Sequence, residues 1–169
     1  MRAENTELKG SLAYAIHAEI QAEEFYRNWA NSVSPAAPEG ASLRIELERL
    51  AEWEEGHANQ LKELYERSFG QKFVSDPDVV VDPALKVQAD WFGGGDKDLV
   101  ALSVAYVSET SAAAFYDKLA ERVDGKLAEL FESLADMERD HAKTILKHYS
   151  ELREMIERES ISKMFGEPG

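Results

Sequence analysis

The sequence predicts an all-α fold, a bundle of four helices arranged as two hairpins with a long crossover between the second and third helices. Three observations support this. Apolar residues recur at three- and four-residue spacing through four long segments, breakers separate those segments, and the first half of the chain resembles the second. The 169 residues, 44% of them hydrophobic, are enough for one domain with an apolar core. We therefore expect a single domain over 1–169.

The first hairpin is expected over 6–31 and 41–69. In the first of these segments apolar residues such as Leu12 and Ile16 lie one turn apart, which places them on one face. The intervening residues contain two prolines and a glycine, which do not continue a helix. Gly70 is well placed to end the second helix.

Residues 71–95 predict a crossover connection, with one helical turn around 84–91. Proline and a run of three glycines punctuate this stretch, and a loop of this length is uncommon in a compact domain unless the chain must travel a full helix length. Trp91 and Phe92 are expected to pin the crossover to the bundle.

The second hairpin is expected over 96–123 and 126–159. Asp96 is a good N-cap for its first helix, and a tight turn at Asp124-Gly125 precedes its second. We expect residues 160–169 to form a flexible tail.

Composition excludes several classes of function. With 33 acidic and 19 basic residues the formal charge is −14, which disfavours nucleic acid and anionic membranes as partners. The absence of cysteine excludes disulfides, thiolate metal sites and cysteine nucleophiles. No apolar run approaches the ~18 residues of a membrane span, and the N-terminus lacks a signal core, so we expect a soluble, cytoplasmic protein.

The chain contains an internal repeat. When 15–30 is aligned with 105–120, and 50–65 with 134–149, six of 16 residues are identical in each pair of segments. The second pair repeats Glu54-x-x-His57 as Glu138-x-x-His141, and this spacing places both side chains on one helical face. That face is the apolar one in both segments.

Glu19 and Glu109 are repeated in the same way and lie in line with the apolar residues of their own helices. Burying ionised carboxylates costs several kcal/mol each unless a partner compensates. Two divalent cations balance four carboxylates, and two neutral histidines complete the ligand set of a dinuclear site in a four-helix bundle. These ligands suit iron or manganese, and zinc can also occupy such a site.

Together these motifs resemble the rubrerythrin-type members of the ferritin-like superfamily. The resemblance includes Glu19-x-x-Ala22-x-x-Phe25-Tyr26 and its repeat, and it extends over about residues 8–152. It implies a ferritin-like bundle with a di-iron centre that reduces hydrogen peroxide, or oxidises Fe(II) with O₂ or peroxide, in oxidative-stress defence, and a homodimer. It also implies ligand roles: Glu19 and Glu109 terminal, Glu54 and Glu138 bridging, His57 and His141 one to each metal.

The sequence departs from this family in two respects. Rubrerythrins carry a rubredoxin domain with an iron–tetracysteine centre, and without cysteine this chain needs a separate donor protein or small reductant for its electrons. They also carry a further glutamate where this chain has Ala112, so the usual ligand exchange is in doubt. Glu23, one turn after Glu19, is a candidate for a seventh carboxylate.

Tyr26 and Tyr116 lie seven residues after their ligand glutamates, on the same face. We expect their hydroxyls to orient ligand carboxylates, with ordinary aromatic packing as the alternative. Two alternatives to an oxidoreductase also remain open: a non-enzymatic iron-binding, carrier or storage protein, and a metal-free bundle whose repeat reflects ancestry alone.

Overall fold

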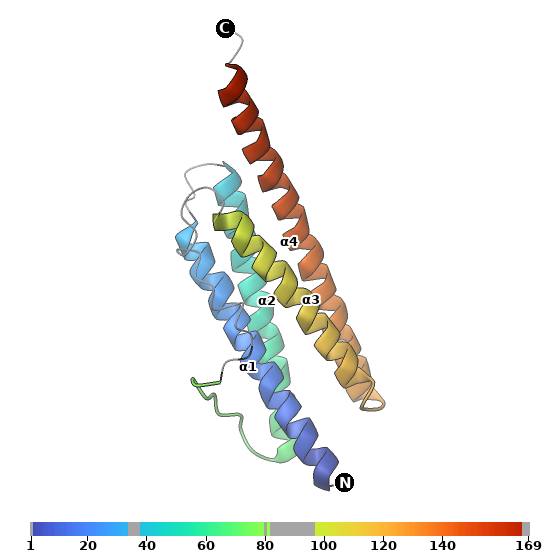
Figure 1. The fold of residues 1–169 in the computed structure, drawn as a ribbon. Helices are drawn as coiled ribbons and strands as arrows, with labels where there is room; N and C mark the ends of the chain where they lie inside the picture. Colours follow the sequence, from blue (N-terminus) through green and yellow to red (C-terminus); the bar gives the residue numbers. More distant parts are fainter. Residues whose placement is uncertain (1, 34–37, 80, 82–96, 167–169) are drawn as a thin grey trace. The chain divides into compact units, whose positions relative to one another are not determined.

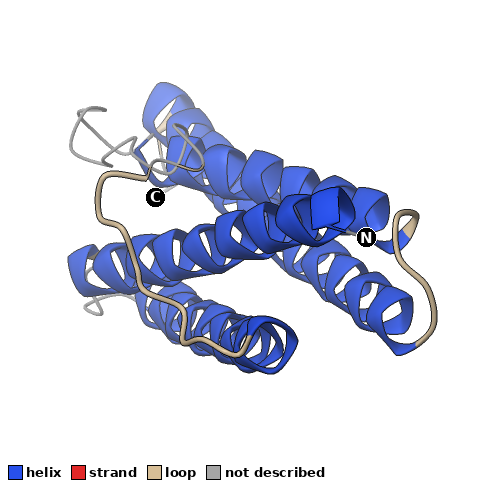
Figure 2. Ribbon diagram, turned by 90° about the horizontal axis from the view of Figure 1, so that it is seen from below, coloured by secondary structure: helices blue, strands red, loops and turns tan. Residues whose placement is uncertain are grey.

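The computed structural model consists of four helices, α1 (Arg2–Ser32), α2 (Pro38–Phe69), α3 (Lys97–Ala120) and α4 (Lys126–Phe165) (Figure 1). It describes the chain except for residues 1, 34–37, 80, 82–96 and 167–169. Within these described parts there is no strand (Figure 2). The helical prediction is thus confirmed, and the chain divides into two compact units, Met1–Lys86 and Val87–Gly169.

In the first unit α1 packs antiparallel against α2 (Figure 1). Large apolar side chains at helical spacing close the interface, so the predicted faces are the buried ones: Leu12, Ile16, Leu47, Leu50 and Leu61. Pro38 occupies the first position of α2, where its missing N–H is not needed and its fixed φ suits the helix. Consequently α2 begins three residues before the predicted Ala41.

Gly70 ends α2 in the left-handed conformation, with φ of 66°, and its N–H donates to the carbonyl of Glu66. The chain then lies on α1. The ring of Phe73 meets His17 edge to face at 5.0 Å. Further along, Gln21 donates to the carbonyl of Val79 over 2.6 Å. The described part of the predicted crossover thus contacts the first helix, while the predicted turn at 84–91, Trp91 and Phe92 lie outside the described residues.

In the second unit α3 packs antiparallel against α4 (Figure 1). The helix α3 ends at Ala120, before the predicted Val123, because the next residues form turns of i→i+3 type, such as Arg122 N–H to Leu119. Gly125, with φ of 62°, precedes α4. The predicted N-cap Asp96 lies outside the described residues.

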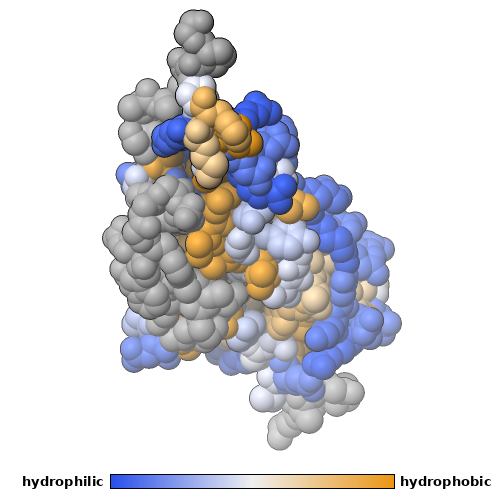
Figure 3. Space-filling model, turned by 45° about the horizontal axis from the view of Figure 1, so that its top comes forward, coloured by the Kyte–Doolittle hydropathy of each residue, from blue (hydrophilic) through white to orange (hydrophobic). Residues whose placement is uncertain are grey.

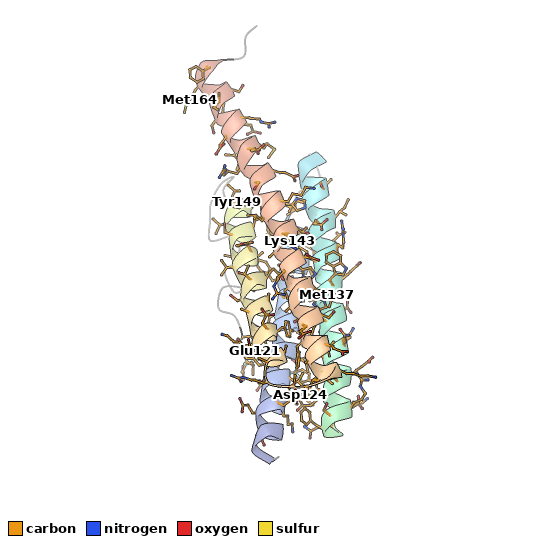
Figure 4. The ribbon with its side chains drawn as sticks, turned by 90° about the vertical axis from the view of Figure 1, so that its right-hand side faces the viewer. Glu121, Asp124, Met137, Lys143, Tyr149 and Met164 are labelled. Atoms are coloured by element: carbon orange, nitrogen blue, oxygen red, sulfur yellow. The ribbon has the colours of Figure 1, made fainter. Side chains whose placement is uncertain are left out.

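The predicted end of the last helix at Glu159 was wrong, since α4 continues to Phe165. No breaker occurs between Ser160 and Phe165, and Gly166, with φ of 69°, is the first residue that ends the helix. Figure 4 shows Met164 on this continuation, well beyond Tyr149. The flexibility of 160–169 stays a prediction.

A salt bridge joins the two helices of each unit at equivalent positions, with its charges exchanged. In the first unit Arg27 on α1 pairs with Glu55 on α2 over 3.3 Å. The repeat aligns these residues with Asp117 and Arg139, which pair over 2.5 Å. Nη2 of Arg139 also donates to the other Asp117 oxygen, and the hydrogen bond to Asp117 is the main cause of the raised pKa of the guanidinium. Both units therefore keep the contact although neither residue type is kept.

By length and composition one described helix, Asp98–Ala120, is long and apolar enough to cross a membrane, with a mean hydropathy of 1.3 over its most apolar window. The sequence was expected to contain no apolar stretch of the length that a membrane span needs. Core helices of soluble proteins meet the same criterion, and this one carries the buried Glu109. The finding is weak evidence for a membrane partner.

Candidate metal centre

In the first unit Glu19 of α1 meets Glu54 and His57 of α2 in the interior. Nδ1 of His57 lies 3.4 Å from Oε2 of Glu19 and 3.5 Å from Oε2 of Glu54. Glu54 and His57 are one turn apart on α2, so the i, i+3 spacing places both donors toward the same point. We call these three residues the first cluster.

The second unit builds the same arrangement from Glu109 of α3 with Glu138 and His141 of α4, all buried. Nδ1 of His141 lies 3.4 Å from Oε2 of Glu109 and 3.2 Å from Oε2 of Glu138. These three residues are the second cluster. In both clusters the same imidazole nitrogen faces one carboxylate from each helix of the hairpin, so the sequence repeat is also a repeat of donor geometry.

The donors of each cluster fit a metal ion. Their ligand atoms lie within 4.8 Å of one another. Donors roughly 2.0–2.2 Å from a shared ion are themselves about 3.0–3.5 Å apart. Each imidazole nitrogen lies at such a distance, 3.2–3.5 Å, from its two carboxylates. The charges also fit, because two buried carboxylates in each cluster carry −2, a neutral imidazole adds none, and one divalent cation balances them.

The six predicted residues are therefore brought together in two sets of three, each within its own unit. Among the residues that the structure describes, every group of three or more metal-capable side chains is drawn from these six. Their role as ligands stays a prediction.

Other predicted site residues lie close to the clusters in sequence but have different surroundings. Glu23 accepts a hydrogen bond from Arg27 over 2.7 Å and lies outside the first cluster. Tyr26 and Tyr116 are buried, as expected of either of their two roles, and Tyr116 stacks on Phe131. Their predicted contact with ligand carboxylates stays a prediction.

His17, two residues before Glu19, is buried but belongs to the contact with Phe73. Burial lowers its pKa, and the nearby Asp76 acts in the opposite direction more weakly. Its position at i−2 from Glu19 turns it toward another side of α1.

The rubrerythrin family model matches residues 11–94 and 101–167 of this chain. The chain belongs to the rubrerythrin family. A solved structure of a hypothetical protein from Pyrococcus furiosus is similar, with 34% sequence identity, a TM-score of 0.76 and coverage of 88% of this chain and 91% of that one. No curated protein matches the chain. Family membership confirms the predicted resemblance and the all-α, ferritin-like fold class, and it places both clusters within the matched residues.

Proposed function

We propose that this rubrerythrin-family chain binds two metal ions, one in each cluster, as a di-iron metalloprotein that acts as an oxidoreductase. The observation that carries the proposal is the repeated geometry of His57 and His141, each with Nδ1 facing a carboxylate from either helix of its hairpin. Buried carboxylates in this arrangement are stabilised by divalent cations. Family membership favours iron as the metal.

When bound, a pair of ferrous ions supplies two electrons, which is the number needed to cleave the O–O bond of hydrogen peroxide. The chain's own residues supply position and charge. Glu54 and Glu138, almost completely buried, hold negative charge where the metal is required, and the imidazoles of His57 and His141 are turned toward these carboxylates. Leu50, one turn before Glu54 on α2, is also buried.

The substrate we propose is hydrogen peroxide, or O₂ with Fe(II) as the reductant, in defence against oxidative stress. Because the sequence has no cysteine, it carries no iron–thiolate centre, and we propose a separate protein or small molecule as electron donor. We further propose a homodimer in the cytoplasm.

Metal analysis after anaerobic loading with Fe(II) tests the binding step. We expect two iron atoms per chain in the wild type and fewer than two in His57→Ala. His148→Ala is the matched control because His148 contacts Glu151 outside both clusters, and it should retain two. Wild-type protein that binds no iron would contradict the metal-binding proposal and favour a metal-free bundle.

Stopped-flow mixing of the iron-loaded protein with hydrogen peroxide tests the reaction. We expect oxidation much faster than that of free Fe(II) under the same conditions. Oxidation at the free-ion rate, together with iron uptake far beyond two atoms per chain, would instead support a storage protein, whose acidic surface gathers cations. Magnetic coupling between the two ferric ions of the oxidised protein would show that they share bridging ligands.

A further inference from the structure

Residues 71–79 and 81, which follow α2 and which we call the strap, are held on α1 although they form no helix or strand. Three residues of the strap are half-buried, Phe73, Val79 and Val81, and the others are exposed. These three are also the residues that contact α1. The strap therefore turns one side to the helix and the other side to solvent.

The side-chain amide of Gln21 binds the strap at two points. Its Nε2 donates to the carbonyl of Val79 over 2.6 Å, and its Oε1 accepts from the N–H of Val81 over 3.3 Å. One amide thus pairs with a carbonyl and an N–H two residues apart, as a peptide group of a neighbouring strand does in a parallel sheet. The hydroxyl of Tyr14 donates to the carbonyl of Val81 over 3.1 Å. Side chains of α1 therefore bind the backbone of the strap.

Phe73 fixes the start of the strap against both helices of the first unit. Its ring meets His17 of α1 at 5.0 Å and Tyr65 of α2 at 5.8 Å, edge to face in both cases. Gln71 donates to the hydroxyl of Tyr65 over 3.2 Å. Because the strap is the covalent continuation of α2 beyond Gly70 and is bound to α1, it is a tether between these two helices.

The first cluster joins the same two helices on the other side of α1. Glu19 of α1 lies within 3.4 Å of Nδ1 of His57 on α2. Glu19 is two residues from both His17 and Gln21, which is about 200° around a helix of 3.6 residues per turn. The strap thus lies against the back of the helix that presents Glu19 to the cluster.

The second unit has a cluster of the same geometry but no strap among the residues that the structure describes. The repeat aligns His17 and Gln21 with Val107 and Ser111. Val107 is 55% exposed, and the hydroxyl of Ser111 donates within its own helix, to the Val107 carbonyl. The helix α4 continues to Phe165, and Figure 3 shows apolar surface at this end, below the uppermost grey residues. The chain therefore contains one cluster with a strap and one without.

We infer that Gln21 is a positioning residue for the first cluster, because its grip on the strap holds α1 against α2 with Glu19 in place to bind the ion. The strap and the ion restrain the same pair of helices, so each reduces the freedom that the other must remove. The second cluster binds its ion without this help. The inference rests on the proposed metal binding, and it adds a difference between two clusters whose ligands are the same.

The coupling acts in both directions. By thermodynamic linkage, the strap strengthens metal binding by the same factor by which the metal strengthens closure of the strap. Such couplings are typically about 5–150-fold. Since the contacts of Phe73 and Tyr14 remain when Gln21 is replaced, we expect a change near the lower limit, about fivefold. A change of this size alters the affinity and leaves the number of ions bound at saturation unchanged.

The affinity for Zn(II), measured by competition with a chromophoric chelator, tests each cluster separately. His141→Ala leaves all three ligands of the first cluster, and His57→Ala leaves all three of the second. We expect Gln21→Ala to weaken Zn(II) binding about fivefold in the His141→Ala protein and to leave it unchanged in the His57→Ala protein. No weakening in the His141→Ala protein would overturn the inference, and so would equal weakening in both proteins.

Two further variants of the His141→Ala protein separate positioning from a general loss of structure. Tyr14→Phe removes only the hydroxyl that donates to the strap, so it should weaken Zn(II) binding by less than Gln21→Ala does. Asn28→Ala is the matched control, because Asn28 is exposed on the same side of α1, seven residues after Gln21, and the affinity should not change. Unchanged affinity in Tyr14→Phe, or an effect of Asn28→Ala as large as that of Gln21→Ala, would contradict the inference.

Amide hydrogen exchange followed by NMR measures the reverse direction of the coupling. In the His141→Ala protein, the N–H of Val81 should exchange about fivefold more slowly with Zn(II) than without it, because this N–H donates to Gln21. The N–H of Glu129, which donates to the Gly125 carbonyl in the second unit, is the reference and should not change. Unchanged exchange at Val81 in protein that has bound Zn(II) would overturn this inference alone. Protein that binds no Zn(II) would contradict the metal-binding proposal as well.

Discussion

Nδ1 of His141 lies 3.2 Å from Oε2 of Glu138, three residues earlier on the same helix, and the pair is buried. In the first unit His57 and Glu54 repeat this relationship at 3.5 Å. A single Glu-x-x-His is common on helix surfaces, but two buried copies that each face a third carboxylate indicate a chemical requirement rather than chance. The buried carboxylates place negative charge in the core, and metal ions can balance this charge.

Metal binding should stabilise the fold, and Glu138→Gln should reduce that effect, because it removes a ligand of the second cluster and leaves the first cluster intact. A ligand present at 100 times its dissociation constant adds about 2.7 kcal/mol, which for a chain of this size corresponds to a rise in Tm of about 5–10 °C. Glu138→Gln removes a ligand but relieves buried charge, so the metal-free variant should melt higher than the metal-free wild type. Thermal unfolding followed by circular dichroism, with and without Mn(II), measures both effects.

Glu132→Gln is the control for this experiment, because Glu132 is exposed on the same helix. Its Tm should rise on metal addition as much as that of the wild type. An equal rise in Glu138→Gln would show that the metal acts elsewhere on this acidic protein.

His17 and His57 should differ in what their loss affects, although both are buried in the first unit. His17→Ala removes the aromatic contact with Phe73 and should cost about 1–3 kcal/mol of unfolding free energy. It should leave the iron content unchanged. His57→Ala should lower the iron content, and iron loading should stabilise it less than the wild type.

Chemical unfolding of the metal-free proteins, with iron analysis of the loaded ones, separates these two effects. A His17→Ala protein that unfolds like the wild type but has lost iron would reverse the assignment, and would make His17 the functional histidine of this unit.

The ion pair between α3 and α4 should contribute more to unfolding stability than the equivalent ion pair between α1 and α2. Arg139 holds both oxygens of Asp117, whereas Arg27 reaches Glu55 through one contact of 3.3 Å. Exposed ion pairs contribute little to stability in general, and pairs with shorter contacts contribute more than pairs with longer ones. Arg139→Ala should therefore lower unfolding stability more than Arg27→Ala does.

A double-mutant cycle measures the coupling in each pair, with Asp117→Ala and Glu55→Ala as the second substitutions. The coupling should decrease in high salt in both pairs, because their side chains are exposed. A larger coupling for Arg27 and Glu55 would contradict the ranking.

Helical periodicity and the repeat predicted four helices and the two sets of candidate ligands, because burial selects residues at three- and four-residue spacing. The end of α4 was harder to predict. Apolar periodicity weakens near Ser160, whereas the helix ends only before Gly166, which has a left-handed conformation. The contact of Phe73 and Val79 with α1 was not predictable from periodicity, because an irregular segment has none. Its position depends on tertiary contacts such as those of Gln21.

Gly70 and Gly10 should respond in opposite directions to the same substitution. Gly70 has a φ of 66°, where a Cβ costs about 1–2 kcal/mol, so Gly70→Ala should lower unfolding stability by about that amount. Gly10 lies within α1 and is exposed, and a Cβ at this position would meet no other atom within 4 Å. Gly10→Ala should therefore raise stability by about 0.5–1 kcal/mol, because alanine loses less backbone entropy in a helix.

Urea unfolding of the two variants beside the wild type measures both shifts through the midpoint at constant m-value. The comparison also tests the contact of the segment after α2 with α1, because the turn at Gly70 directs the chain onto α1. If Gly70→Ala were as stable as the wild type, the left-handed turn would not hold the end of α2, and residues after Phe69 would be free to continue the helix as the equivalent residues of α4 do.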